Sequence, residues 1–152
     1  MAVTQRQKLL IQESFLKVEP IADVAADIFY KKLFEYDPSL KALFKGDMKK
    51  QGVMLMSTLK VAVKGLDNLE ELVPVLQKLA IKHLDYGVKV EDYTPVGNAL
   101  IFALKTGLAD AFTEELKNAW IAVYKVIANV MREAAYPEFD GHAFQNAKKY
   151  NH

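Results

Sequence analysis

Hydrophobic residues recur every three or four positions along nearly the whole chain, and no stretch shows the polar–apolar alternation of a strand. The pattern is clearest near the C-terminus, where the apolar residues of one long segment share a single helical face: Leu116, Trp120, Val123, Ile127, Val130 and Met131. Helices patterned in this way bury their apolar faces by packing against one another. The sequence therefore predicts an all-α fold.

Capping residues and prolines predict where the first helices begin and end. Thr4 and Gln7 have the spacing of a capping box, and Pro20 is expected to break the helix that they open. A second helix is expected to stop at Asp37-Pro38, because proline disfavours helical geometry in the residue before it. An irregular corner should then follow.

The next predicted helix runs over about 48–64. Asp67 with Glu70 is expected to cap one short turn, and Pro74 suits the first turn of a new helix. Gly87 should end that helix, since glycine is favoured just past a helix C-terminus.

Two further helices are predicted by the same signals. Thr94-Pro95 repeats the pattern of a cap followed by proline, for a helix that reaches about residue 109. Thr113 is expected to cap the last helix, and Tyr136-Pro137 to close it.

Length and composition fit one globular domain, which we expect over residues 1–136 with a polar tail over 137–152. Of the 152 residues, 51% are hydrophobic and 26% charged, unlike a disordered or a membrane chain. No apolar run approaches the roughly 18 residues that a membrane-spanning helix needs. The first ten residues lack the apolar core and cleavage site of a secretory signal, so a cytoplasmic location is expected.

Charge and cysteine content exclude several classes of function. The 20 basic and 19 acidic residues are interspersed, so neither nucleic acid nor an anionic membrane is an expected partner. Without cysteine, the chain can form no disulfide, thiolate metal site, iron–sulfur cluster or cysteine nucleophile. Phosphate-loop, serine-hydrolase and zinc-protease motifs are also absent. Any metal must therefore use nitrogen or oxygen ligands, or arrive inside a cofactor.

His83 is the residue best placed to carry chemistry. The other two histidines, His142 and His152, lie in the polar tail, where solvation is the simplest interpretation. Leu79 lies one turn before His83 and adds apolar surface beside the imidazole. A flat apolar cofactor ligated through its metal would need such a surface, although ordinary core packing would produce the same pattern.

Two polar residues interrupt otherwise apolar helix faces. Tyr30 follows Phe29, and Gln51 lies one turn before Leu55. Taken alone, both residues are compatible with a place at the surface.

Six stretches, in this order, resemble a single-domain globin, close to the bacterial haemoglobins and to the globin domain of flavohaemoglobins. They are IFYKKLF around Tyr30, DPSLKALF ending at Phe44, KKQGVMLM around Gln51, LQKLAIKHLDYGV around His83, DYTPVG around Tyr93, and AWIAVYKVIANV in the last helix. The resemblance spans about Gln5 to Met131. It implies the globin fold, in which helices pack in pairs around one haem.

The resemblance also implies roles for particular residues. His83 would ligate the iron of haem b (iron protoporphyrin IX), and Phe44 would pack flat on the porphyrin. Tyr30 and Gln51 would be the distal hydrogen-bond donors to a bound gas. Less diagnostic positions are expected to line the pocket: Leu55, Leu79, Val88, Tyr93, Val96 and Ile127.

The function implied is reversible binding of O2, for storage, scavenging or transport, with NO or another small molecule as further ligands. The Tyr30 and Gln51 pair implies tight, slowly released O2. A haem-free interaction module is the other non-enzymatic possibility, and the resemblance argues against it. The protein is expected to be a monomer or a weak homodimer.

An enzymatic alternative also follows from the resemblance: a nitric oxide dioxygenase, or a weak peroxidase. Flavohaemoglobins convert O2 and NO to nitrate, and strengthen the proximal imidazole through a tyrosine and a carboxylate. Tyr93 matches the tyrosine, but the carboxylate position falls on Ala135, with Glu133 the nearest acid. This departure argues against strong electron donation by His83. Because 152 residues leave no room for a flavin domain, turnover is expected to need an external reductase.

Overall fold

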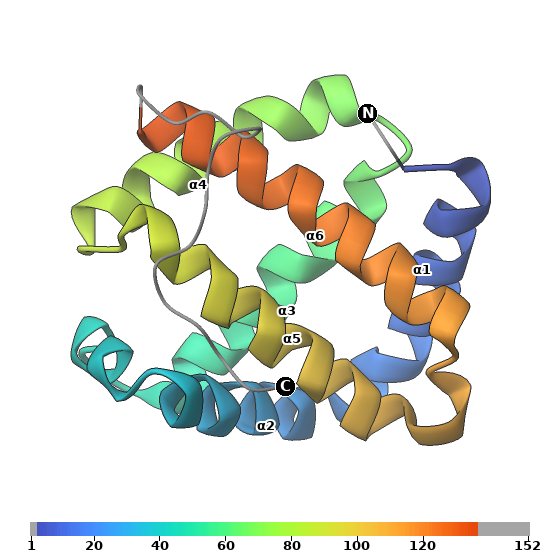
Figure 1. Ribbon diagram of the computed structural model, residues 1–152, viewed down its shortest axis with the longest axis horizontal. Helices are drawn as coiled ribbons and strands as arrows, with labels where there is room; N and C mark the ends of the chain where they lie inside the picture. The colour runs from blue at the N-terminus through green and yellow to red at the C-terminus, as the bar shows by residue number, and fades with distance from the viewer. Residues whose placement is uncertain (1–2, 137–152) are drawn as a thin grey trace.

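The computed structural model describes residues 3–136, and within them it contains six α-helices and no strand (Figure 1). The helices are α1 (Gln5–Val18), α2 (Ala22–Tyr36), α3 (Met48–Gly65), α4 (Leu69–Asp85), α5 (Tyr93–Leu108) and α6 (Glu114–Ala135). Short 3₁₀ helices join several of them: Glu19–Ile21, Pro38–Leu43, Val90–Asp92 and Ala109–Ala111. The all-α prediction is confirmed, whereas the expected tail, with His142 and His152, lies outside the described residues.

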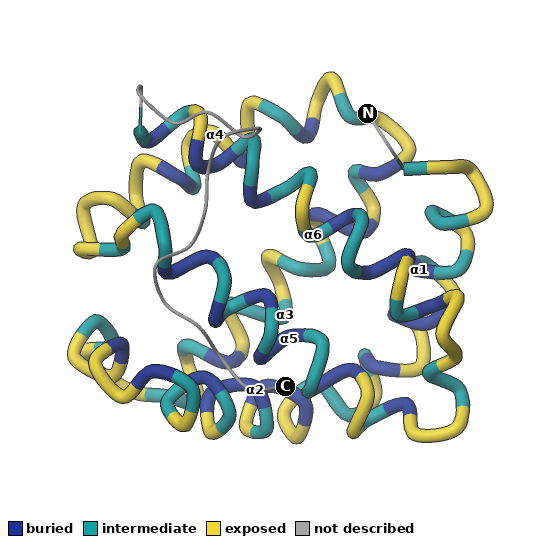
Figure 2. Tube along the Cα trace, viewed as in Figure 1, coloured by how far each residue is buried: buried dark blue, intermediate teal, exposed yellow. Residues whose placement is uncertain are grey.

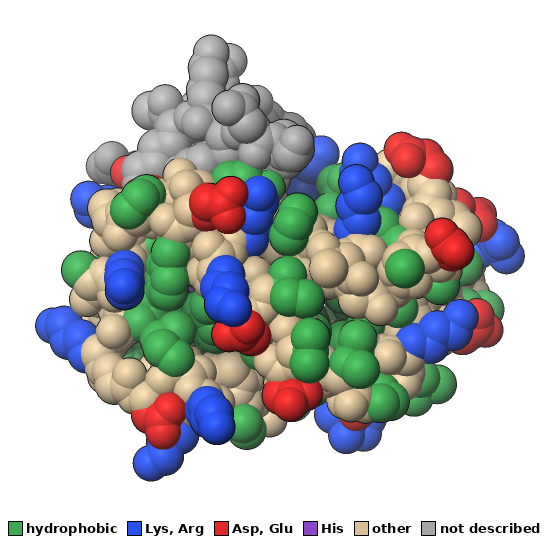
Figure 3. All heavy atoms as spheres, turned by 90° about the horizontal axis from the view of Figure 1, so that it is seen from below, with side chains coloured by type: hydrophobic (Ala, Val, Ile, Leu, Met, Phe, Trp, Pro, Cys, Tyr) green, Lys and Arg blue, Asp and Glu red, His purple; other side chains and the backbone are tan. Residues whose placement is uncertain are grey.

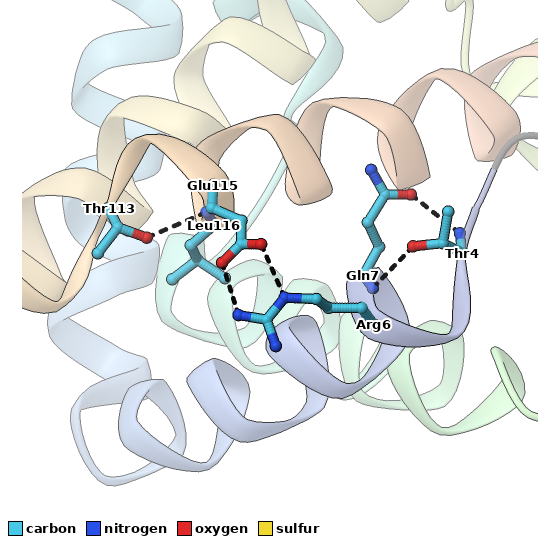
Figure 4. Close-up of polar contacts among 6 residues, drawn as sticks. All are labelled: Thr4, Arg6, Gln7, Thr113, Glu115 and Leu116. Carbon is cyan, nitrogen blue, oxygen red and sulfur yellow. Dashed lines mark hydrogen bonds and ion pairs between the residues drawn. The ribbon is translucent and has the colours of Figure 1, made fainter.

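The threonine caps lie where the sequence predicts them (Figure 4). The Thr4 hydroxyl accepts the backbone N–H of Gln7 at 3.1 Å, and the Gln7 side chain accepts the backbone N–H of Thr4 at 3.0 Å. Thr113 Oγ1 accepts the N–H of Leu116 at 3.2 Å. These bonds satisfy N–H groups that have no partner inside the helix. They therefore fix where α1 and α6 begin.

A bidentate ion pair joins the beginnings of α1 and α6. Arg6 Nε and Nη2 donate to the two carboxylate oxygens of Glu115 at 2.7 and 2.8 Å (Figure 4). The guanidinium hydrogen bond lowers the pKa of Glu115. Both side chains are exposed, so the pair contributes little to stability and mainly sets how α1 meets α6.

Two predicted helix starts are wrong. Asp67 and Glu70 do not cap a separate turn, because Asn68 caps one continuous α4 by accepting the N–H of Glu71 at 3.4 Å. Pro74 lies inside this helix and not in its first turn. A proline costs a helix one hydrogen bond, and its position in the second turn of α4 limits the disruption to the N-terminal end.

The start of α5 differs from the prediction by two residues. The helix begins at Tyr93, so Thr94 is not its cap, and Asp92 takes the N-cap position. The Asp92 carboxylate instead accepts the backbone N–H of Lys89 at 2.9 Å and closes the preceding 3₁₀ turn. This turn connects α4 to α5, and its geometry determines where Tyr93 lies.

The helices pack in crossing pairs. α2 packs mainly against α5, α4 packs against α6, and α1 also packs against α6. Figure 1 shows α2 along the bottom of the view, with α5 and α6 crossing above it. Figure 2 shows that the exposed positions of α2 face away from the other helices, whereas its buried positions face them. This arrangement follows from the helical period of the apolar residues.

The centre of the core contains a polar contact between α1 and α6. Trp120 is 1% exposed, and its indole Nε1 donates to Ser14 Oγ at 3.0 Å. Ser14 Oγ in turn donates to the carbonyl of Ile11 at 2.8 Å. Burying both polar side chains is therefore compensated, since each has a hydrogen bond.

Two properties of the surface bear on partners. On the face drawn in Figure 3, positive and negative side chains are interspersed, and hydrophobic side chains gather in patches between them. That face shows no field of a single sign of the kind that attracts polyanions. Among the described residues, no helix combines the length and apolarity that crossing a membrane requires.

Candidate functional site

A cavity of about 600 Å³ lies between α2, α3, α4, α5 and α6. All ten residues that the sequence analysis selected line it: Tyr30, Phe44, Gln51, Leu55, Leu79, His83, Val88, Tyr93, Val96 and Ile127. Its volume is in the usual range of ligand pockets, and most of its lining is apolar. The charged residues that border it are Lys45, Asp85 and Asp92. The fold thus brings residues from distant parts of the sequence into one apolar chamber.

His83 lies in the last turn of α4 with its ring bordering the cavity. Its Nδ1 lies 2.8 Å from the carbonyl oxygen of Leu79, one turn earlier. That carbonyl can only accept, so Nδ1 carries the proton of the neutral ring and Nε2 keeps its lone pair. Burial lowers the pKa of His83, and the bond to the carbonyl opposes this in part. The neutral imidazole is the form that ligates a metal.

The backbone just after His83 is fixed by a tight turn. Gly87 has φ = +97°, a conformation that favours glycine, and it ends α4 as the sequence predicts. The N–H of Val88 then donates to the carbonyl of His83 at 3.0 Å. This turn brings Val88 back to the cavity wall beside the imidazole.

Tyr30 and Gln51 come together at the wall formed by α2 and α3. Tyr30 is 8% exposed, and its hydroxyl donates to the backbone carbonyl of Gln51 at 3.2 Å. Burial raises the pKa of Tyr30 to about 12, so the phenol stays protonated and remains a donor. The Phe44 ring packs edge-on against Tyr30, with centroids 5.3 Å apart. Tyr30 is therefore held among aromatic rings away from the surface, whereas Gln51 is half-buried at the cavity wall.

Tyr93 has the one buried side-chain polar atom that lacks a hydrogen-bond partner among the described residues, its hydroxyl oxygen. The residue is 6% exposed, and burial raises the pKa of its phenol. The Arg132 guanidinium lies over its ring, 5.4 Å from the centroid. Ala135 is the position where the resemblance would place a carboxylate. It belongs to the same buried hydrophobic cluster as Tyr93, so this position contributes an apolar methyl group to that cluster.

Sequence reasoning missed the contacts by which the end of α6 holds the segment between α4 and α5. Arg132 Nε donates to the carbonyl of Val90 at 2.9 Å, and its Nη2 donates to Thr94 Oγ1 at 3.2 Å. The Tyr136 hydroxyl donates to the carbonyl of Val88. The acceptors are mostly backbone carbonyls, which carry no signal in the sequence.

Tyr124 is a second residue that the sequence analysis missed. Its hydroxyl donates to the carbonyl of Tyr93 at 2.5 Å, and its ring lies against Gly97 of α5. A Cβ at Gly97 would lie only 2.5 Å from the ring of Tyr124, so glycine is required for this close approach. A glycine within a predicted helix was the available signal, because it often marks close packing.

The globin family model matches residues 27–131, which is more than half of the chain. The chain is a globin. The family assignment and the fold class predicted from the sequence are both confirmed.

Curated relatives of this globin include flavohemoproteins. The one from Halalkalibacterium halodurans is 30% identical over 84% of this chain, but over only 32% of its own length. This globin spans 26% to 35% of the length of the first three flavohemoproteins that it matches.

Solved structures support the same fold. A bacterial globin from Campylobacter jejuni has a TM-score of 0.77 at 27% identity, covering 88% of this chain and 97% of its own. A hexacoordinated heme protein from an anhydrobiotic tardigrade has a TM-score of 0.81. At 22% identity, over 88% of this chain and 96% of its own, it shows the similarity of fold alone.

The globin family and the flavohemoprotein relatives imply a haem cofactor, and the cavity fits one. An apolar chamber suits the porphyrin, and His83 offers Nε2 as a nitrogen ligand from its wall. Among the described residues, no group of three or more histidine, aspartate or glutamate side chains could hold a bare metal ion.

Removing the Tyr93 hydroxyl should cost little stability. The hydroxyl has no hydrogen bond to lose, so we expect Tyr93→Phe to change the free energy of unfolding by under about 1 kcal/mol, or to increase it. Tyr124→Phe is the matched control, because it loses the bond to the carbonyl of Tyr93 and should destabilise by about 0.5–1.5 kcal/mol. Urea unfolding measures both, and a larger loss in Tyr93→Phe would show that the hydroxyl has a partner.

Proposed function

We propose that this globin binds O2 reversibly at the iron of haem b, with His83 as the proximal ligand. The observation that carries the proposal is the geometry of His83, whose Nδ1 is engaged by Leu79 while its ring borders an apolar cavity. The haem would supply an iron with one coordination position open to a diatomic gas. The bond at Nδ1 fixes the tautomer of the ring, so that Nε2 has the lone pair with which His83 would bind the iron.

In this proposal Phe44, Leu55, Leu79, Val88 and Val96 pack on the porphyrin and keep water away from the iron. All five line the cavity, and none has a polar side chain that would hold a water molecule there. Tyr93 and Ile127 complete the wall on the side of α5 and α6. A dry pocket favours reversible binding over loss of the ferrous state.

Tyr30 and Gln51 are proposed as the donors to the gas ligand. The Tyr30 hydroxyl has a single proton, which the Gln51 carbonyl now accepts. Stabilising a polar ligand therefore means exchanging one acceptor for another, and the net gain is the difference, on the order of 1 kcal/mol. The Gln51 side-chain amide offers further donors at the same wall. O2 gains from such donors more than CO, which is a poor acceptor.

The second candidate is a nitric oxide dioxygenase, or a weak peroxidase, supplied with electrons by an external reductase. The flavohemoprotein relatives support it. The proximal side favours simple binding instead, since Nδ1 of His83 donates to a neutral carbonyl, and Ala135 packs in the cluster around Tyr93. An imidazole bonded to a neutral acceptor donates less electron density than one bonded to a carboxylate.

Replacing His83 tests the proposed ligand. We expect His83→Ala to lose haem, or to retain it only weakly, because the substitution removes the nitrogen that would bind the iron. The absorption spectrum and the rate of haem transfer to apomyoglobin measure the effect. Lys82→Ala, an exposed neighbour in the same helical turn, should leave both unchanged. An unaltered haem spectrum in His83→Ala would mean that another residue ligates the iron.

Replacing Tyr30 tests the distal hydrogen bond. Tyr30→Phe should speed O2 dissociation about tenfold while changing CO dissociation by less than about twofold, because only the polar ligand loses a donor. Stopped-flow displacement measures both rates. Tyr36→Phe is the matched control, since Tyr36 belongs to the same helix but does not line the cavity. Equal acceleration for the two gases would argue against hydrogen bonding by Tyr30.

Turnover distinguishes the two candidate functions. A single reaction of the oxygenated protein with NO is uninformative, because most oxygenated globins destroy NO once. We expect NO consumption to stop after about one equivalent when an external flavin reductase and a nicotinamide cofactor are supplied, since Nδ1 of His83 is bonded to the neutral carbonyl of Leu79. An NO electrode follows the reaction. Sustained consumption over many equivalents would favour the dioxygenase.

A further inference from the structure

The end of α4 is closed by two backbone hydrogen bonds that together form a Schellman motif. The N–H of Gly87 donates to the carbonyl of Leu84 at 3.0 Å, and the N–H of Val88 donates to the carbonyl of His83 at 3.0 Å. Gly87, at φ = +97°, supplies the left-handed residue that this motif requires. Val88, the first residue past the turn, is thus bonded directly to the backbone of His83.

Val88 is also held from its other side, by a residue at the end of α6. The Tyr136 hydroxyl donates to the carbonyl of Val88. Both side chains pack against one hydrophobic cluster, as does that of Leu79. The backbone of Tyr136 is itself fixed, because its N–H donates to the carbonyl of Arg132 at 2.8 Å. A phenol at the end of a long helix therefore anchors the segment that follows His83.

Arg132 supports the same segment further along the chain. It lies four residues before Tyr136, and its guanidinium donates to the Val90 carbonyl at 2.9 Å and to Thr94 Oγ1 at 3.2 Å. These bonds reach residues beyond Val88, and neither acceptor residue is the one bonded to His83. Tyr136 is therefore the donor whose acceptor residue is connected to His83 by a hydrogen bond of its own.

The bond that His83 makes within α4 does not replace such an anchor. Nδ1 lies 2.8 Å from the carbonyl of Leu79, which belongs to the same helix. This contact fixes the ring relative to α4, but it does not fix the last turn of α4 relative to the cavity. Groups that orient a ligating histidine are part of how a protein tunes its metal. An anchor outside α4 would supply that second constraint.

We propose that Tyr136 is a positioning residue for His83: its hydroxyl holds Val88, and the bond from Val88 to His83 carries that constraint to the turn that bears the imidazole. The proposal rests on the proposed function, because it concerns the direction of Nε2 toward the iron. The resemblance would place a carboxylate at Ala135, the residue before Tyr136. Here the end of α6 contacts the backbone beside His83 instead, which orients the ring without increasing its electron donation.

Tyr136→Phe tests the role, because it removes the hydroxyl and keeps the ring. We expect the iron–histidine stretching band of the ferrous, ligand-free protein to shift and broaden. Haem transfer to apomyoglobin should become about tenfold faster, since the imidazole is less well oriented. Resonance Raman spectroscopy and stopped-flow absorption measure the two effects. An unchanged band in Tyr136→Phe would overturn the proposal.

Thr113→Ala is the matched control for stability. It removes one hydrogen bond at the other end of α6, the cap to the N–H of Leu116, and should destabilise the protein without moving the band. Hydrogen exchange of the Val88 N–H in the ferrous CO form gives a local readout. It should be about tenfold faster in Tyr136→Phe than in Thr113→Ala, because only the former frees this segment. Equal exchange in the two variants would mean that the hydroxyl acts on stability alone, which contradicts a positioning role.

Gly87→Ala interrupts the same connection at the turn. Alanine rarely adopts a φ of +97°, whereas its Cβ would make only an ordinary contact with Leu43 at 3.4 Å, so the backbone is what changes. Adding Tyr136→Phe to Gly87→Ala should raise the rate of haem transfer by less than about twofold, because the two changes break one chain of contacts. Independent effects that multiply in the double variant would show that Tyr136 acts by another route.

The two proposals fail in different ways. If the parent protein has no iron–histidine band, the proposed ligation by His83 is wrong, and the positioning role is wrong with it. If the parent protein has the band and Tyr136→Phe leaves it unchanged, the positioning role is wrong and the proposed function stands.

Discussion

The contact between His83 Nδ1 and the carbonyl of Leu79 determines what the rest of the site can do. It assigns the ring proton to one nitrogen and leaves the other with a lone pair beside the cavity. The contact exists because the two residues are one helical turn apart in α4, so the ring of His83 reaches back to the carbonyl of Leu79. The proposed metal ligand, His83, therefore lies at the cavity wall in the last turn of α4, and Gly87 ends the chain's helical path just after it.

Hydrogen bonds from α6 and from Tyr136 hold the segment that connects α4 to α5, together with the start of α5. Arg132 and Tyr136 donate to carbonyls of the segment after His83, and Tyr124 donates to the carbonyl of Tyr93. The cavity of about 600 Å³ lies on this side of the molecule. The hydrogen bonds to backbone carbonyls tie the segment between α4 and α5, which borders that cavity, to a long helix.

The sequence predicted most of the fold because the helices of this chain are marked by local signals. Thr4, Thr113 and Gly87 act as caps and stop signals as expected, since a cap depends only on residues within one turn. Asp67 and Thr94 were wrongly expected to act as caps. In both cases a neighbouring residue, Asn68 or Asp92, takes the N-cap position, and the choice depends on how the preceding loop enters the helix.

The site residues were predictable because they lie in sequence stretches that resemble those of globins, and all ten selected residues line one cavity. The bond from the Tyr30 hydroxyl to the Gln51 backbone could not be predicted in the same way, because a carbonyl is identical at every position. It has a functional consequence under the proposed mechanism. The donor for the gas is also the group that joins α2 to α3, so a ligand that attracts this proton also loosens the contact between the two helices. Ligand affinity and the packing of α2 on α3 are then coupled through a single hydroxyl, and each kcal/mol that the ligand gains is reduced by what that contact loses.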